Sequence, residues 1–290
     1  MDVIIEKNIR DNPKLRESFN DLAVKTFDLS FKPWFQGGFW ADKYIPYSIT
    51  DKGKIVANVS VNIVDTIWKG CPKRYIQLGT VMTAPEYRKR GLSRCLIEEI
   101  FNDWQHKCDA VYLFANDTVL DFYPKFGFVK EKEYQYKMNI DPQSEKIKKL
   151  DMSNAEDCAI LKNYYLKSNP FSALPMIGNY GLLMFYCAFS MRDCIYYSKE
   201  YDAVIIFEQD DENLICYDVF CDNTATPLVD ILSGIASKEV KYGILGFTPK
   251  DISGCVVNEI IREGETLFVL NCKDNVFATN KVMFPRLSHA

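Results

Sequence analysis

The sequence predicts an α/β (α+β) protein with a mixed central sheet and flanking helices. Segments with apolar residues at helical spacing alternate with short segments rich in β-branched and aromatic residues. In addition, a strongly periodic helix over 93–105 stands between two apolar strands, with short connections on both sides. Such a strand–helix–strand unit favours a parallel, right-handed crossover. With 290 residues, the chain has room for one large domain or two medium ones.

The first half supplies the elements of such a sheet. Asp51-Lys52-Gly53 is a typical hairpin turn, and it stands between two segments of β-type composition. A short helical piece is expected around 118–125. The main elements, in the order helix, two hairpin strands, strand, helix, strand and strand, are 10–28, 47–50, 54–61, 74–83, 93–105, 110–115 and 133–138.

The second half repeats this order of elements after a polar, lysine-containing linker over 140–152. The expected elements, in the order helix, three strands, helix, strand and strand, are 154–167, 193–199, 202–208, 213–220, 225–237, 241–247 and 266–270. Because the order resembles that of the first half, we predict two structurally similar domains, 1–140 and 150–290.

Composition and charge exclude several classes of protein. The longest apolar run, 182–189, has eight residues, whereas a membrane-spanning helix needs about 20. The acidic residues in 1–7 are unlike the basic start of a signal peptide, so we expect a cytoplasmic protein. The net charge is −4 and no basic stripe stands out, so neither a nucleic acid nor a membrane is expected as a partner.

The cysteines and histidines do not predict a metal site. The ten cysteines are scattered, with no Cys-x-x-Cys pair, and only two histidines are present. This pattern is typical of reduced cysteines inside a cytosolic protein. We expect no metal cofactor.

The segment that carries chemistry is the polar loop 84–91 between an apolar strand and the periodic helix. Backbone N–H groups at a helix N-terminus are unpaired and bind anions. Gly91 lets a phosphate approach the backbone, and Arg88, Lys89 and Arg90 add positive charge. Together these residues suit a pyrophosphate. The alternative interpretation is a solvated basic loop.

Two motifs resemble those of the GNAT acetyltransferase superfamily. The segment 88–93, Arg-Lys-Arg-Gly-Leu-Ser, is similar to the family's acetyl-CoA loop, Gln/Arg-x-x-Gly-x-Gly/Ala, although Ser93 replaces the final small residue. The segment 122–128, Phe-Tyr-Pro-Lys-Phe-Gly-Phe, is similar to the family's Leu/Phe-Tyr-x-Lys-x-Gly-Phe. The resemblance covers roughly 40–140 and implies a GNAT-like acyl-CoA N-acyltransferase fold. The second half has no such loop, so a repeat of the fold there implies loss of the phosphate site.

The resemblance implies an acetyl-CoA site in the first half. The backbone of the strand residues Val81, Met82 and Thr83 would bind the pantetheine arm. Asn116 would contact acetyl-CoA or a water, although it is equally placed to form a turn. The loop residues expected to hold the pyrophosphate are Arg88, Lys89, Arg90, Gly91, Leu92 and Ser93.

The resemblance also implies that Tyr123 is the general acid that protonates the thiolate leaving group. The competing interpretation is a tyrosine that packs among neighbouring aromatic rings. The sequence does not identify the general base, which could be a carboxylate near in sequence. Some two-domain relatives place their C-terminal carboxylate near the acceptor. Here that carboxylate would belong to Ala290, although the tail that ends there could equally be frayed. The sequence-adjacent carboxylates are Glu86, Asp117 and Asp121. Transfer through Cys95 is a further possibility, but a buried cysteine explains it as well.

The acceptor pocket is expected from an aromatic stretch and from the C-terminal part. The stretch contributes Phe31, Trp34, Phe35, Phe39, Trp40, Tyr44 and Tyr47. These rings suit either an amine cage or an ordinary core. The implied function is transfer of an acetyl group from acetyl-CoA to a primary amine of a small molecule or peptide, by direct attack in a ternary complex. The alternative is a non-catalytic acyl-CoA-binding module. The sequence leaves the oligomeric state undetermined.

Overall fold

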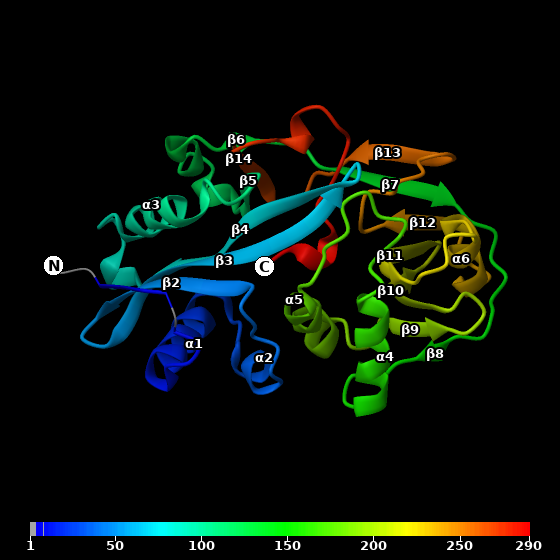
Figure 1. The fold of residues 1–290 in the computed structure, drawn as a ribbon, viewed down its shortest axis with the longest axis horizontal. Helices are drawn as coiled ribbons and strands as arrows, with labels where there is room; N and C mark the ends of the chain where they lie inside the picture. The colour runs from blue at the N-terminus through cyan, green and yellow to red at the C-terminus, as the bar shows by residue number, and fades with distance from the viewer. Residues whose placement is uncertain (1–3, 8) are drawn as a thin grey trace.

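A computed structural model describes residues 4–7 and 9–290, which form two mixed sheets of seven strands each (Figure 1). In sheet order, sheet A contains β1 (Ile4–Glu6), β2 (Tyr44–Asp51), β3 (Lys54–Trp68), β4 (Cys71–Thr83), β5 (Ala110–Ala115), β14 (Thr266–Asn271) and β6 (Val129–Lys130). In the corresponding order, sheet B contains β8 (Lys148–Lys149), β9 (Ile195–Ser198), β10 (Ala203–Asp210), β11 (Asn213–Phe220), β12 (Tyr242–Leu245), β7 (Tyr134–Asn139) and β13 (Cys255–Glu259). The predicted α+β class is confirmed.

The two sheets have the same sequence of strand directions. Read from β1 or from β8, each has three antiparallel pairs, one parallel pair and two more antiparallel pairs. The parallel pairs, β4–β5 and β11–β12, are the two crossover units that the sequence predicts. The predicted repetition of element order is therefore confirmed at the level of whole sheets.

The sheets exchange one strand each. β14, from the end of the sequence, lies between β5 and β6 in sheet A, while β7, from the middle, lies between β12 and β13 in sheet B. The predicted ranges 1–140 and 150–290 thus do not coincide with the two sheets, although each contributes most strands of one. The division of the chain into two separate domains at these boundaries stays a prediction.

Helices cover both faces of each sheet (Figure 1). α1 and α2 pack on one face of sheet A and α3 on the other. α6 packs on one face of sheet B, and α4 and α5 pack on the opposite face. Their bounds are α1 Pro13–Phe27, α2 Lys32–Gln36, α3 Leu92–Trp104, α4 Ala155–Tyr165, α5 Tyr180–Phe185 and α6 Leu228–Ile235.

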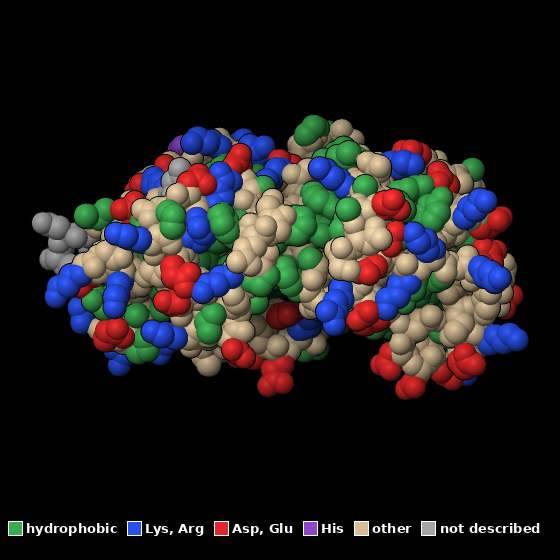
Figure 2. Space-filling model, turned by 90° about the horizontal axis from the view of Figure 1, so that it is seen from below, with side chains coloured by type: hydrophobic (Ala, Val, Ile, Leu, Met, Phe, Trp, Pro, Cys, Tyr) green, Lys and Arg blue, Asp and Glu red, His purple; other side chains and the backbone are tan. Residues whose placement is uncertain are grey.

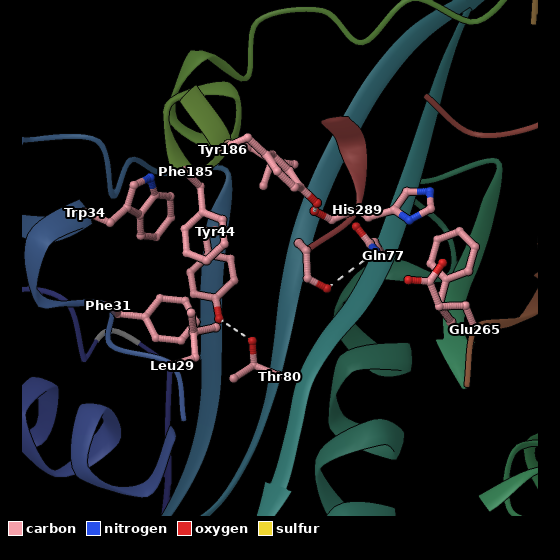
Figure 3. A pocket seen from close by; sticks show the side chains of 13 residues that line it. Leu29, Phe31, Trp34, Tyr44, Gln77, Thr80, Phe185, Tyr186, Glu265 and His289 are labelled. Atoms are coloured by element: carbon pink, nitrogen blue, oxygen red, sulfur yellow. Dashed lines mark hydrogen bonds between the residues drawn. The ribbon is translucent and has the colours of Figure 1, made fainter. Parts of the chain in front are cut away.

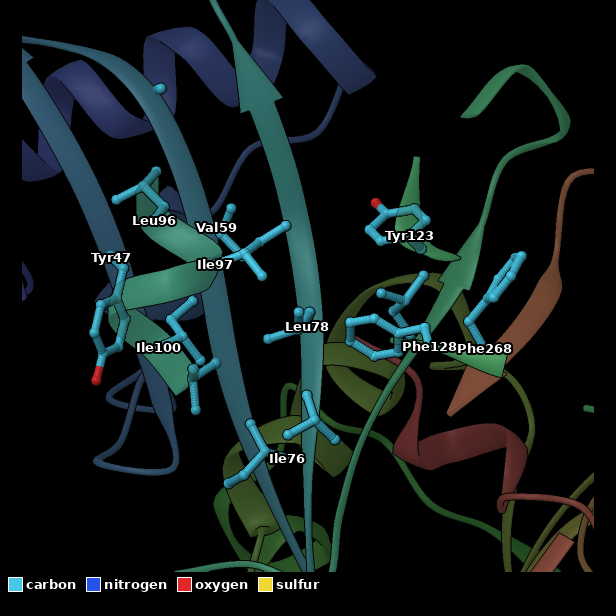
Figure 4. Packing of buried hydrophobic residues seen from close by; sticks show 14 of the residues in the cluster. Tyr47, Val59, Ile76, Leu78, Leu96, Ile97, Ile100, Tyr123, Phe128 and Phe268 are labelled. Carbon is cyan, nitrogen blue, oxygen red and sulfur yellow. The ribbon is translucent and has the colours of Figure 1, made fainter. Parts of the chain in front are cut away.

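The core between α3 and sheet A holds the crossover unit together (Figure 4). Leu96, Ile97 and Ile100 are fully buried on the apolar face of α3, as the helical spacing predicts. They pack against strand residues that include Ile76 and Leu78 of β4. Truncating such a side chain to alanine typically costs about 2–5 kcal/mol, so this core fixes the position of the loop that precedes α3.

Several elements were not predicted, namely the short β1, α2, β6 and β8, and also α5 and β13. The run 182–189 forms the end of α5 and a π-helical turn over Tyr186–Ser190, because its apolar residues are buried on several sides and show no clean helical period. β13 was missed because its side chains are mostly exposed on a sheet edge, so that its apolar residues do not stand out. Within residues 4–7 and 9–290, no helix combines the length and apolar character needed to span a bilayer.

Candidate acetyl-CoA and acceptor site

β4 carries a bulge in the middle of sheet A. Asn58 of β3 pairs with Met82, but Ser60 pairs with Gly79, so β4 contains one extra residue over this interval. Thr80 lies within the bulge at φ 47, in the left-handed region that a β-branched residue rarely adopts. Such backbone strain is typically found at functional sites.

β4 and β5 diverge at the same level. Their parallel pairing covers only Tyr75–Ala110, Ile76–Val111 and Gln77–Tyr112. Both strands continue beyond these pairs, β4 to Thr83 and β5 to Ala115. Within residues 4–7 and 9–290, no strand pairs with the backbone edge of β4 that would continue the parallel ladder. An extended ligand could bond to it.

The loop after β4 presents a free helix N-terminus. A short 3₁₀ turn, Pro85–Tyr87, is followed by two left-handed residues, Lys89 at φ 62 and Gly91 at φ 77. Gly91 is the N-cap of α3, and no side chain caps that end of the helix. A Cβ built on Gly91 would meet nothing within 4 Å, so the space before the helix is open. The first N–H groups of α3 can therefore receive an anion.

A cavity of about 370 Å³ lies between this loop and the diverging end of β4. We call it the loop cavity. It is lined by Thr26, Val81, Met82, Thr83, Tyr87, Arg88, Lys89, Gly91, Leu92, Ser93, Arg94, Val119, Phe122 and Tyr123. Eight of the ten residues predicted to bind acetyl-CoA are among them, together with the predicted acid. The structure thus brings together two motifs that lie about 30 residues apart in the sequence.

Two of the predicted binding residues lie outside the loop cavity. The guanidinium of Arg90 lies 4.8 Å from the ring centre of Tyr87 and donates a hydrogen bond to the backbone oxygen of Glu86 at 2.7 Å. The side-chain oxygen of Asn116 accepts hydrogen bonds from the backbone N–H and the hydroxyl of Thr118, at 3.0 and 3.1 Å. In the structure Asn116 therefore forms the turn that its residue type favours.

Tyr123 lies on the wall of the loop cavity with its ring buried. It begins a 3₁₀ turn, Tyr123–Phe126, and its ring packs against Phe122, Phe128 and Phe268. Burial raises the pKa of its hydroxyl to about 12. The phenol therefore stays protonated at neutral pH, and the aromatic packing that we considered as an alternative coexists with access to the cavity.

The other candidate groups lie away from the loop cavity. Cys95 is half-buried on α3 and does not line the loop cavity. The carboxylate of Asp117 accepts a hydrogen bond from the N–H of Gly264 at 3.0 Å, and neither Glu86 nor Asp121 is among the lining residues. Within the described part of the chain, no cluster of three or more His, Cys, Asp or Glu could hold a metal ion.

Comparison with known families agrees with this geometry. The model of the acetyltransferase (GNAT) domain matches 42–130, a range that contains β4, the loop, α3, β5 and Tyr123. Residues 42–130 are a GNAT acetyltransferase domain. The predicted resemblance is confirmed over this range.

Solved structures match the fold over nearly the whole chain. A probable N-acyltransferase from Enterococcus faecalis aligns with a TM-score of 0.61 and 15% identity, over 94% of this chain and 73% of that one. A GCN5-related N-acetyltransferase from Kribbella flavida aligns with a TM-score of 0.56 and 13% identity, over 94% of this chain and 72% of that one. Eis1 from Mycobacterium abscessus aligns with a TM-score of 0.56 and 13% identity, over 94% of this chain and 74% of that one. At these identities the likeness concerns the fold. A search of curated proteins gave no match.

A second cavity, of about 220 Å³, adjoins the GNAT domain's β4 on the side of α2 and α5 (Figure 3). We call it the aromatic cavity. It is lined by Leu29, Phe31, Trp34, Tyr44, Gln77, Thr80, Phe114, Leu182, Phe185, Tyr186, Glu265, His289 and Ala290. Thr80 lines this cavity and the next residue, Val81, lines the loop cavity. Neighbouring residues of the β4 bulge therefore line the two cavities.

Only part of the predicted aromatic stretch reaches the aromatic cavity. Phe31, Trp34 and Tyr44 line it, whereas Trp40 packs in the core beneath them. Tyr47 lies in the core cluster beside α3, and its hydroxyl donates to Asp103 at 2.7 Å. The stretch is thus partly pocket and partly core.

Ala290 lines this cavity, as expected for the C-terminal part, but the contribution of α5 was not predicted. Phe185 packs 5.7 Å from both Phe31 and Trp34, measured between ring centres, and the indole N–H of Trp34 donates to the backbone oxygen of Gly181 at 2.7 Å. These contacts join α5 to the first half. The apolar run 182–189 was the available signal, but nothing in its sequence indicates which surface it covers.

The C-terminal segment forms the polar wall of the aromatic cavity. The ring of His289 stacks on Phe114, with 3.9 Å between ring centres, and its backbone oxygen accepts a hydrogen bond from the Tyr186 hydroxyl at 2.6 Å. Burial and two nearby arginines lower the pKa of His289 well below its usual value, so the ring is neutral. Ala290 lies against β4, where a Cβ on Gly79 would stand 2.5 Å from the Ala290 oxygen. Residues 288–290 are therefore packed in place, as the close approach at Gly79 requires.

Charged side chains of both signs are interspersed on the face of the molecule in Figure 2. That face shows no continuous basic surface. The whole sequence is similarly balanced in charge, with 35 basic and 39 acidic residues.

Proposed function

We propose that the protein transfers an acetyl group from acetyl-CoA to a primary amine of a small molecule or peptide, by direct attack in a ternary complex. The observation that carries this proposal is the position of Tyr123. Its protonated hydroxyl shares one cavity with the open N-terminus of α3 and with the unpaired edge of β4.

The loop cavity suits the two ends of the acetyl-CoA molecule. The pyrophosphate would lie at the N-terminus of α3, where backbone N–H groups, Arg88 and Lys89 supply positive charge. The pantetheine arm would extend along the free edge of β4 over 81–83, whose amides would otherwise lack a partner on that side. This orientation directs the thioester toward the bulge and the aromatic cavity.

The transfer then follows from the neighbouring groups. The neutral amine nitrogen attacks the thioester carbonyl carbon, and a backbone N–H of β4 stabilises the developing oxyanion. The C–S bond breaks as the amide forms, and the leaving thiolate takes the proton of the Tyr123 hydroxyl. Tyr123 regains a proton from water, and the amine loses its proton to the solvent. Cys95 lies outside the loop cavity, which supports direct attack over an acyl-cysteine route.

The test combines binding and turnover in one preparation. Acetyl-CoA binding would be measured by calorimetry, and acceptor-dependent thiol release would be followed with a panel of amines. Tyr123→Phe is expected to lower kcat by about 10²-fold or more, since general acids contribute about 10²–10⁴. The Kd for acetyl-CoA should stay within twofold.

Tyr87→Phe is the matched control for this substitution. Tyr87 lines the same cavity, but its hydroxyl donates to Asp51 at 2.5 Å and has no proposed role in catalysis. Its kcat should change little. An unchanged kcat in Tyr123→Phe would refute the acid assignment, and acetyl-CoA binding without thiol release to any amine would favour an acyl-CoA-binding module instead.

A further inference from the structure

The aromatic cavity is divided into an apolar end and a polar wall (Figure 3). At one end, the rings of Phe31, Trp34, Tyr44 and Phe185 surround the space together with Leu29. Phe31 and Trp34 are 4% and 3% exposed, so their rings are almost fully buried. On the opposite wall lie Gln77, Glu265 and His289.

The charges on the polar wall determine which ligand groups it can receive. Among the described residues that line the cavity, none is a lysine or an arginine. The Glu265 carboxylate lies 3.3 Å from the Arg286 guanidinium and 3.5 Å from that of Arg262. Glu265 is the one acidic side chain in the lining, and its two arginine partners lie outside the lining. Because Glu265 already pairs with two arginines, a second ammonium group on a ligand would compete with them for the one acidic side chain of the lining.

The size of the cavity limits the ligand further. A volume of 220 Å³ corresponds to roughly seven water molecules at about 30 Å³ each. Drug-sized ligands occupy about 300–1,000 Å³. The space suits a compact acceptor, whereas an aminoglycoside or several residues of a peptide would extend beyond it.

We infer that the acceptor is a small monoamine with an apolar body, such as an arylalkylamine or a branched alkylamine. This inference rests on the proposed function. The body occupies the aromatic end, and the amino group lies at the Gln77–Thr80 side of the cavity, where β4 passes from one cavity to the other. The amine nitrogen thereby meets the thioester at the bulge.

The test compares four acceptors that differ in one property each. Phenethylamine has the inferred character, putrescine adds a second amine, phenylalanine adds a carboxylate, and glucosamine replaces the apolar body with hydroxyls. We expect kcat/KM for phenethylamine to exceed that of each of the others at least tenfold. A preference for putrescine, phenylalanine or glucosamine would overturn the inference while leaving amine acetylation intact.

A cavity-filling variant locates the binding site. Leu29 is a half-buried loop residue at the aromatic end, so Leu29→Trp should fill the space without disturbing a helix or strand. It should raise KM for phenethylamine at least tenfold and leave KM for methylamine and the Kd for acetyl-CoA unchanged. Leu166→Trp, at a leucine that is 73% exposed and outside the cavity, is the control.

Direct binding separates failure of the inference from failure of the proposed function. Phenethylamine binding would be measured by calorimetry on the full chain, with and without Leu29→Trp. Binding that Leu29→Trp removes supports the apolar-amine site even if no transfer occurs, in which case the proposed function fails alone. No binding of phenethylamine, or binding that is insensitive to Leu29→Trp, would overturn the inference.

Discussion

The two crossover units share one backbone arrangement but differ in the loop that joins the first strand to the helix. In sheet A, β4 leads through the loop 84–91 into α3 and then into β5; in sheet B, β11 leads through 221–227 into α6 and then into β12. Both first strands carry a bulge, since Ile206 and Phe207 of β10 pair with Asp218 and Cys216 of β11 and skip Tyr217. The parallel pairings differ, because β4 and β5 both continue beyond their last pair at Gln77, whereas β12 pairs with β11 over its full length. The bulge therefore belongs to both sheets, and the divergence of the parallel strands to sheet A.

The loops and the space before them differ. The loop 84–91 contains three basic residues and one acidic residue, whereas 221–227 contains only the acidic Asp222, and Pro227 occupies the N-cap position of α6. Asp218 is the counterpart of Met82, because each is the first paired residue beyond the bulge. Asp218 is buried and accepts a hydrogen bond from Asn169 at 2.5 Å. The second sheet thus keeps the bulge but has neither the basic residues nor the glycine of the loop 84–91, and it places a buried carboxyl where the first sheet has a methionine.

The largest effect that we predict concerns this buried carboxyl. Burial raises the pKa of Asp218 to about 7 from an ordinary value of 3.8, so the folded protein favours the protonated form. Its stabilising contribution is complete below the unfolded pKa and is lost as the pH rises through 7. By linkage this amounts to about 4 kcal/mol at most. Asp218→Asn, which resembles the protonated form, should raise the unfolding free energy at pH 8 relative to the native sequence.

The measurement is chemical denaturation between pH 4 and pH 8 for both proteins. The difference in unfolding free energy should grow with pH in favour of Asp218→Asn. Asp222→Asn is the control, because the Asp222 side chain is 72% exposed beside Lys167 and should leave the profile unchanged. Parallel profiles for Asp218→Asn and the native chain would mean that the folded chain does not hold the Asp218 carboxyl in its protonated form.

The second prediction compares two glycines in the same conformation. Gly91 has φ 77 and Gly254, in sheet B's half, has φ 71; both are exposed, and a Cβ on either would meet nothing within 4 Å. Glutamate at either position costs about 1–2 kcal/mol of backbone strain. In Gly91→Glu the carboxylate would also stand before the N-terminus of α3, where it would repel a pyrophosphate.

Calorimetry should therefore show acetyl-CoA binding weakened about 100-fold in Gly91→Glu, or about 2.7 kcal/mol. Gly254→Glu should lose comparable stability in thermal unfolding but bind acetyl-CoA as the native chain does. Equal losses of binding in both variants would indicate a general effect of destabilisation and would contradict the cradle at α3.

Local patterns predicted the parts of the fold that local chemistry determines. The periodicity of 93–105 predicted α3, and the sequence motifs predicted that Tyr123 and the loop lie together, as they do in the loop cavity. The exchange of β7 and β14 could not be predicted, because both are short alternating strands that fit either sheet and only tertiary packing assigns them. The C-terminal part was expected at the acceptor pocket, and Ala290 does line the aromatic cavity. Glu265 and His289 were not singled out, since they reach the cavity only through the path of β14 and the segment after it.

The smallest predicted effects distinguish the basic residues of the loop. Arg88 and Lys89 line the loop cavity, whereas Arg90 is held against Tyr87 and the Glu86 oxygen outside it. Exposed charges of this kind contribute about 0–1 kcal/mol each, so Arg88→Ala and Lys89→Ala should each weaken acetyl-CoA binding up to about fivefold. Arg90→Ala should change the Kd less than twofold. The losses for Arg88 and Lys89 should shrink in high salt, because salt screens exposed charges. If Arg90→Ala weakened acetyl-CoA binding most of the three, the pyrophosphate would lie on the outer side of the loop. The outer surface of 84–91 would then have to be compared with the equivalent surface of 221–227.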